Sequence, residues 1–301
     1  MGEPGVDPTR AAMAMDLTRA AERLAGCPDN LRRAHRLGLH RRWPRAHFHP
    51  TPELFVQTGG VTRFEGPEQR WDLDAGEIGL MPRGVPHAET PLDRETPYGI
   101  VVACYRPTGF TLIRAHAVDE PTGTRRITPK AVAVVDSERG RDAFRYLDEA
   151  EQAWAAGGER RGAGEVAVDL VRVFLRVLAE EARRGEPTRR RYSPVVESAR
   201  AVARSHLADS RLSVDWLARA AGCSPDHLTR RFRAETGSSV VAWLNGERVA
   251  MAQRLLEEKK YQVSEVAWAC GFTHPSYFIR VFRARTGMTP LAFRRTCAAK
   301  V

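Results

Sequence analysis

The chain has 301 residues, of which 43% are hydrophobic and 28% are charged. This apolar content supports buried cores and excludes wholesale disorder, and no run approaches the roughly 18 uninterrupted apolar residues of a membrane helix. The five cysteines are widely spread and form no Cys-x-x-Cys pair, so we expect neither a disulfide framework nor a thiolate zinc site and place the protein in a reducing cytoplasm.

The net charge of +10 is concentrated at one end of the chain. Residues 191–301 contain 18 Lys and Arg residues against 9 Asp and Glu residues, whereas residues 1–190 are nearly neutral. A basic segment attracts phosphates at long range and releases their counterions, which indicates a polyanionic partner. An arginine-rich proteome would give the same bias, so charge alone leaves both explanations open.

Between about residues 45 and 135, short β-branched or aromatic runs alternate with turn-forming residues. This pattern is typical of strands joined by tight turns in a small barrel or sandwich. The runs cover residues 53–58, 61–64, 79–81 and 100–105, and the turns lie at residues 59–60, 74–76 and 82–84.

The next two segments, residues 141–156 and 164–182, have apolar residues at helical spacing. A Gly- and Pro-containing charged run follows and predicts a solvated linker. We therefore expect a barrel with an N-terminal extension in residues 1–136, a helical segment in 137–182, a linker in 183–194 and an all-helical domain in 195–301. One apolar stripe of the helical segment either joins two copies into a homodimer or packs on the chain's own barrel; it consists of Val168, Val171, Leu175 and Leu178.

The basic third of the chain contains a repeat. The hexapeptide at 232–237 is nearly repeated at 282–287, an offset of 50 residues, and the segment at 218–222 corresponds to 267–271, an offset of 49. Each unit reads as a short helix, a turn at a glycine and a second helix that ends at a glycine. In the first unit Ser224 is suited to cap the second helix and Pro225 to begin it. The sequence thus predicts two helix-turn-helix motifs, at about residues 213–234 and 263–284.

The second helix of each unit has an apolar face and a polar, arginine-rich outer face. A face of this size suits the DNA major groove. We expect the first arginine of each face to contact bases and the second to hold phosphates, with a threonine or isoleucine against a thymine methyl group. The aspartate either accepts from cytosine N4 or caps its own helix. The candidate residues are Asp226, Thr229, Arg230 and Arg233 in the first unit and Ser276, Ile279, Arg280 and Arg283 in the second.

Residues 212–296 resemble the DNA-binding domain of AraC-type (AraC/XylS) bacterial transcription regulators. The diagnostic segment is Gly-Phe-x4-Tyr-Phe-x3-Phe-x4-Gly-Met-Thr-Pro at residues 271–290. The resemblance implies two helix-turn-helix units held apart by a long helix, here about residues 239–258, that enter successive major grooves about 34 Å apart. It also implies double-stranded promoter DNA, a small-molecule effector and RNA polymerase as partners.

The N-terminal part resembles the two sequence motifs of cupin barrels, which AraC-type regulators commonly carry as a sensor domain. The motifs are His-x-His-x3-Glu-x6-Gly at residues 47–60 and Gly-x5-Pro-x-Gly-x2-His at residues 76–87. In an extended segment, residues 47, 49 and 53 project to one face, and imidazoles with a carboxylate suit Fe, Mn, Ni or Zn. These side chains either line an effector pocket or bind a divalent metal, although no cofactor is required; they are His47, His49, Glu53 and His87.

The sequence therefore predicts an α+β multidomain protein, with a cupin-like barrel and two following helices before an all-α domain that has two helix-turn-helix units. The favoured function is a sequence-specific, effector-modulated transcription regulator without enzymatic activity. Two alternatives stay open: a metal-dependent cupin enzyme with a DNA-binding tail, and a nucleoid-like protein that binds DNA without sequence preference.

Overall fold

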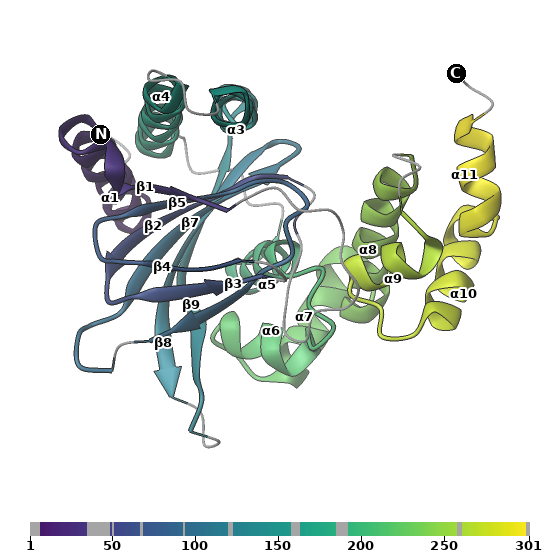
Figure 1. Cartoon of the computed structure of the whole chain (residues 1–301). Coiled ribbons are helices and arrows are strands. Elements are labelled where there is room, and N and C mark those ends of the chain that lie inside the picture. Colours follow the sequence, from purple (N-terminus) through teal and green to yellow (C-terminus); the bar gives the residue numbers. More distant parts are fainter. Residues whose placement is uncertain are drawn as a thin grey trace.

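The computed structural model describes residues 7–34, 49, 51–66, 69–92, 94–119, 123–157, 163–184, 192–257 and 261–298. A sheet-rich N-terminal part is followed by a helical C-terminal part (Figure 1), which confirms the predicted fold class. No helix within these ranges is long and apolar enough to cross a membrane.

The strands of the N-terminal part form a large and a small sheet that face each other (Figure 1). The strands expected from the sequence are present, and two longer strands, β8 and β9, extend the large sheet. Strand β1 pairs with β5 in parallel, and the other pairs are antiparallel. The large sheet has the order β1 (Leu31–Arg33), β5 (Ile78–Met81), β2 (Glu53–Gly59), β7 (Gly99–Arg106), β8 (Gly109–Asp119) and β9 (Arg125–Asp136); the small sheet has the order β4 (Arg70–Leu73), β3 (Thr62–Glu65) and β6 (Ala88–Pro91).

Both faces of the large sheet are covered, and each face has its own core. Successive residues of a strand point to opposite faces, so Leu54 and Val56 of β2 join one hydrophobic cluster with the helices. Phe55, between them, joins a second cluster, between the two sheets, with Phe64 and Met81. Strand β2 is therefore buried on both faces, and its inward residues lie between the two sheets.

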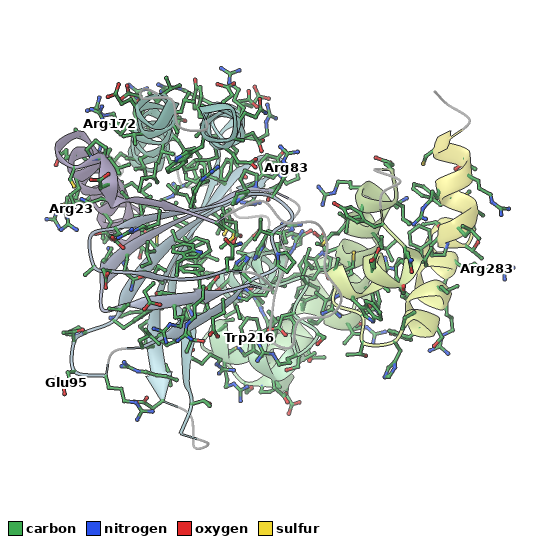
Figure 2. All side chains as sticks on the ribbon, in the orientation of Figure 1. Arg23, Arg83, Glu95, Arg172, Trp216 and Arg283 are labelled. Carbon is green, nitrogen blue, oxygen red and sulfur yellow. The ribbon has the colours of Figure 1, made fainter. Side chains whose placement is uncertain are left out.

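Helices cover the outer face of the large sheet, and side chains fill the space between the two layers (Figures 1 and 2). The predicted stripe of residues 168, 171, 175 and 178 is buried in this layer. Its four side chains therefore pack on the chain's own sheet and helices. Helix α1, which the sequence did not lead us to expect, packs along α4. The helices of this part are α1 (Pro8–Gly26), the short 3-10 helix η1 (Pro28–Asn30), α2 (Glu138–Asp142), α3 (Arg145–Gly157) and α4 (Ala163–Arg184).

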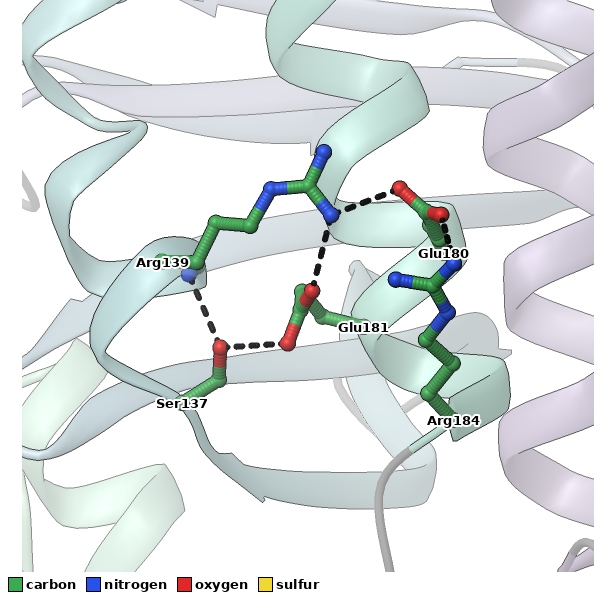
Figure 3. A network of polar contacts seen from close by, with 6 residues as sticks. Ser137, Arg139, Glu180, Glu181 and Arg184 are labelled. Carbon is green, nitrogen blue, oxygen red and sulfur yellow. Dashed lines mark hydrogen bonds and ion pairs between the residues drawn. The ribbon is translucent and has the colours of Figure 1, made fainter.

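A polar network fastens the end of α4 to the turn that follows β9 (Figure 3). The hydroxyl of Ser137 caps α2 by accepting from the Gly140 N–H at 2.9 Å, and it donates to Glu181 at 2.7 Å. Arg139 donates to Glu180 at 2.7 Å and to Glu181 at 3.2 Å. Exposed ion pairs contribute little singly, so the network's main effect is to connect the start of α2 to the last turns of α4.

The C-terminal part is entirely helical and has a single hydrophobic core. Phe232, Phe278 and Phe282 are completely buried in it. Much of the predicted linker lies outside the described residues; α4 extends to Arg184 and the next helix begins at Pro194. The helices are α5 (Pro194–Ser205), α6 (Val214–Ala220), α7 (Pro225–Thr236), α8 (Val240–Glu257), α9 (Val263–Ala269), α10 (Pro275–Thr286) and α11 (Pro290–Ala298).

The two parts touch through β9, against which α5 and α6 lie (Figure 1). Val132 of β9 packs against the core of the helical part. At the same contact, burial lowers the pKa of Arg106 in β7, with Asp136 opposing the shift and Arg204 of α5 adding to it. The sheet and the helical domain thus share a surface in which a charged side chain is largely withdrawn from water.

Candidate nucleic-acid interface and sensor site

The first helix-turn-helix unit has the local signals that start and stop its second helix. The Ser224 hydroxyl accepts from the His227 N–H at 3.3 Å, and Pro225 is the first helical residue, so the predicted cap is confirmed. The helix ends at Gly237, whose φ of 72° is in the left-handed region where glycine carries no Cβ penalty. Helix α7 is thereby fixed in length and direction by its own sequence.

The second unit repeats the helices and turns of the first, but His274, the N-cap residue of its second helix, makes no side-chain capping hydrogen bond. Helix α9 starts with a capping box in which the Glu265 side chain accepts from the Gln262 N–H at 2.6 Å. Helix α10 begins at Pro275 and ends at Gly287, where φ is 79°. The helices that the repeat predicted are therefore present in both units, and α8 takes the place of the predicted long connecting helix.

Each second helix has one buried face and one exposed face. Leu228 and Phe232 of α7, like Phe278 and Phe282 of α10, have no solvent-exposed surface. The eight residues predicted to contact DNA are exposed, and Figure 2 shows Arg283 pointing away from the domain. The structure places Asp226, Thr229, Arg230 and Arg233 on the open face of α7 and Ser276, Ile279, Arg280 and Arg283 on that of α10.

The structure adds Tyr277 to this surface. The residue is 39% exposed, and its ring lies under the Arg280 guanidinium, 5.2 Å from ring centroid to Cζ. Its hydroxyl accepts from the Asn245 side chain of α8 at 3.2 Å. The sequence analysis includes this tyrosine in the family motif but not among the residues predicted to contact DNA. Its place next to Ser276 on a helix with an exposed face could have indicated that role. Tyr277 orients Arg280 and ties α10 to α8.

Three buried polar residues of the N-terminal part lie close together. His49, Glu53 and His87 each offer a ligand atom, and these atoms all lie within 4.8 Å of one another. His49 Nδ1 is 3.2 Å from Glu53 Oε1, and the two imidazole centroids are 5.4 Å apart. All three residues are buried. His47, the fourth predicted member, lies outside the described residues.

Two further residues that the sequence analysis missed surround this cluster. His87 Nε2 is 3.4 Å from Glu89 Oε1, and the thiol of Cys104 hydrogen-bonds Glu53. Burial raises the pKa of Glu53 well above its usual range, the charge of Glu89 raises it further and the Cys104 hydrogen bond opposes the shift. Burial and the charge of Glu89 thus both disfavour the ionised form of the Glu53 carboxyl.

The donor set fits a divalent transition metal. His87 Nδ1 lies 2.9 Å from the Val85 carbonyl oxygen. When Nδ1–H donates to that oxygen, Nε2, which lies 3.4 Å from Glu89 Oε1, keeps its lone pair for a metal. Two imidazoles and a carboxylate are typical ligands of Fe, Mn, Ni or Zn. The same buried donors and acceptors also suit the polar groups of a small molecule.

Comparison with known proteins finds sequence matches to the helical domain. Residues 217–296 match the model of a helix-turn-helix domain family. The arabinose operon regulatory protein of Escherichia coli K12 is 36% identical over 96 residues, which is 32% of this chain and 33% of that protein. The HTH-type transcriptional activator RhaR of Enterobacter sp. strain 638 is 43% identical over 72 residues, or 24% of this chain and 26% of that protein. The DNA-binding domain of AdpA, solved with a target DNA, is 40% identical with a TM-score of 0.34, and the match covers 36% of this chain and 96% of that chain.

Two helix-turn-helix units joined by a long helix, each with an exposed second helix, define a DNA-binding domain. The sequence matches identify it as a DNA-binding domain of the AraC type, and the relatives that carry it are transcription regulators. The chain spans about a third of the length of the curated relatives it matches.

Proposed function

We propose that the whole protein is a transcription regulator that binds promoter DNA sequence-specifically and responds to a small molecule in its N-terminal barrel. The observation that carries the proposal is the pair of exposed, arginine-bearing faces on α7 and α10, presented by the same motif twice. Paired helix-turn-helix units suit the reading of base edges in successive major grooves. Non-specific nucleoid binding would not require this arrangement.

The exposed residues divide into base-reading and phosphate-holding groups. We assign Arg230 and Arg280 to guanine, because a guanidinium can donate to O6 and N7 together. Arg233 and Arg283 lie one turn further along and are assigned to phosphates. Ser224 supplies the cap of α7, which supports a base contact for the exposed carboxylate of Asp226.

Three residues of the two faces remain, and their roles are weaker. Thr229 and Ile279 are suited to contact a thymine methyl group, and the Ser276 hydroxyl can donate to or accept from a base edge. Ile279 is 38% exposed, so an apolar side chain stands in solvent on a face that is otherwise polar. Burial of this side chain under DNA would favour binding.

Binding of the full-length protein to DNA selected from a randomised duplex library tests this function. A double variant, Arg230→Ala with Arg280→Ala, should lose the preference for the selected DNA over an excess of random duplex. The matched control replaces two exposed arginines of the N-terminal part, Arg145 and Arg184, with alanine and so keeps the same net charge. Equal loss in both double variants would contradict sequence reading by α7 and α10.

We assign effector sensing to the buried cluster around His49, Glu53 and His87. The contact of α5 and α6 with β9 supports this assignment, because it gives the barrel a packed route to the DNA-binding domain. Val132→Asp should break that route. In this variant, a ligand that binds the N-terminal part should no longer change the affinity for DNA. If the ligand still changes that affinity as it does in wild type, the proposed route is contradicted.

A divalent metal is a second candidate for this cluster, because three buried ligand atoms already converge there. When bound, the metal would hold an anionic group of the effector or fix the barrel. Purified protein stripped with a chelator and titrated with Co²⁺ should develop ligand-field absorption at one equivalent. His87→Ala should abolish it, and His116→Ala, a histidine outside the cluster, should not; absence of any spectral change in wild type would leave the small-molecule pocket as the assignment.

Dimerisation, contact with RNA polymerase and a cytoplasmic location complete the proposal. Promoter binding places the protein beside the polymerase and its DNA.

Because the stripe containing Val171 is buried, a dimer surface on α4 would have to use its outer side, where Val166 and Val173 are exposed. Sedimentation should then show a dimer for the wild type and a monomer for Val173→Glu. A wild-type monomer at micromolar concentration would contradict the dimer.

A further inference from the structure

A buried arginine occupies the centre of the DNA-binding domain. Arg248 of α8 is 8% exposed, and its Nε and one Nη each lie 2.9 Å from a backbone carbonyl oxygen, those of Leu207 and Asp209. Its guanidinium also stands 5.7 Å from the Phe272 ring centroid. Leu207 and Asp209 lie in the turn between α5 and α6, so they belong to the entrance of the first helix-turn-helix unit.

The turn of the second unit lies against the same two residues, Leu207 and Arg248. Gly271 joins α9 to α10 with a φ of 77°. A Cβ atom at this residue would lie 2.4 Å from the Leu207 carbonyl oxygen and 2.8 Å from an Arg248 nitrogen. Glycine is therefore needed both for the left-handed backbone and for the close approach. The carbonyl that Arg248 binds in the first unit thus touches the backbone of the second unit.

We propose that Arg248 is a positioning residue that fixes the separation and relative angle of α7 and α10, so that both enter the grooves of one DNA site. The proposal rests on the DNA-binding function proposed above. Helix α8 connects the two units, and helices of both pack on it in the shared hydrophobic core. The junction of Arg248, Leu207 and Gly271 adds a direct connection between the units, and a guanidinium that holds two carbonyls in fixed directions is suited to it.

This connection differs from the other contacts across α8. Arg204 pairs with Glu247, and Asn245 donates to Tyr277, but these pairs are at least partly exposed to solvent. Exposed pairs exchange readily with water and hold geometry weakly. A cation that stays buried but loses its acceptors is left uncompensated in the interior, which is strongly unfavourable. Arg248 is therefore the contact best suited to keep the two units in register.

The test compares intact and divided DNA sites. The probes are a duplex of about 20 bp selected by the wild-type protein, each half of it embedded in scrambled sequence, and intact sites with one base pair inserted or removed between the halves. Arg248→Met should bind the intact site at least tenfold more weakly and each half within about twofold of wild type. It should also tolerate the changed spacings better than wild type. Arg254→Met, an exposed arginine of the same helix, is the matched control and should behave as wild type.

Two further variants separate positioning from stability. Gly271→Ala should give the same signature, because its methyl group pushes the Leu207 carbonyl away. Arg248→Lys, which keeps the charge, should restore part of the intact-site affinity. Equal weakening of intact and half sites, an unchanged spacing penalty, or loss of folding in all three junction variants would overturn the positioning role. Failure of the wild-type protein to select any sequence would instead overturn the proposed function.

Discussion

Replacement of Arg230 by alanine isolates one base contact from the rest of the domain. The side chain is exposed on α7, whose buried face is formed by other residues, so we expect the free energy of unfolding to change by less than about 0.5 kcal/mol. Loss of a bidentate contact to guanine costs about 1–3 kcal/mol. At about 1.4 kcal/mol per tenfold change, the affinity for the selected site should fall roughly 5- to 150-fold.

Fluorescence anisotropy with a labelled duplex measures this loss, and a set of duplexes substituted at each base pair locates it. The variant should lose discrimination at a single position, where wild type prefers G·C. The matched control is Arg231→Ala, because Arg231 is exposed on the same helix but pairs with Glu235 at 2.8 Å. An unchanged binding curve for Arg230→Ala, or an equal loss for Arg231→Ala, would show that the wrong face of α7 was assigned to the groove.

Three other substitutions test one phosphate contact, the core between the large sheet and its helices, and the core of the helical domain. Arg233→Ala should weaken binding to all sequences alike and reduce the slope of log affinity against log salt by about 0.9, measured by titration at several salt concentrations; a loss confined to one sequence would refute the phosphate assignment. Leu175→Ala, at a fully buried position of α4, should destabilise the N-terminal part by about 2–5 kcal/mol in urea unfolding. Phe282→Ala, fully buried in the helical domain, should cost about 3–5 kcal/mol. Changes under 1 kcal/mol in either case would contradict the assigned core.

Local signals explain why the DNA-binding helices could be predicted. Ser224, Pro225 and the glycines that end each second helix act within a few residues of where they stand in the sequence. The sequence repeat then predicts the helices of the second unit from those of the first. Each outer face followed from helical spacing once one apolar pair, such as Phe278 and Phe282, had been placed inward.

Non-local packing explains what the sequence analysis missed. Arg248 has the appearance of an ordinary solvated helix residue, and its burial depends on carbonyls about 40 residues away. Glu89 and Cys104 join the histidine cluster through strand pairing, and a shift of one residue in either register would turn them outward. Helix α1 carried the signal of Met13, Leu17 and Leu24 at helical spacing, but its position against α4 followed from no local motif.

The central claim, sequence-specific regulation through two recognition helices, is tested most directly with natural DNA. The purified full-length protein is incubated with fragments of its own genome at moderate salt, and the retained fragments are sequenced. The account predicts enrichment of a few fragments that share a site of about 17–21 bp, long enough for two helices one turn apart. Retention of fragments without a shared sequence would contradict it.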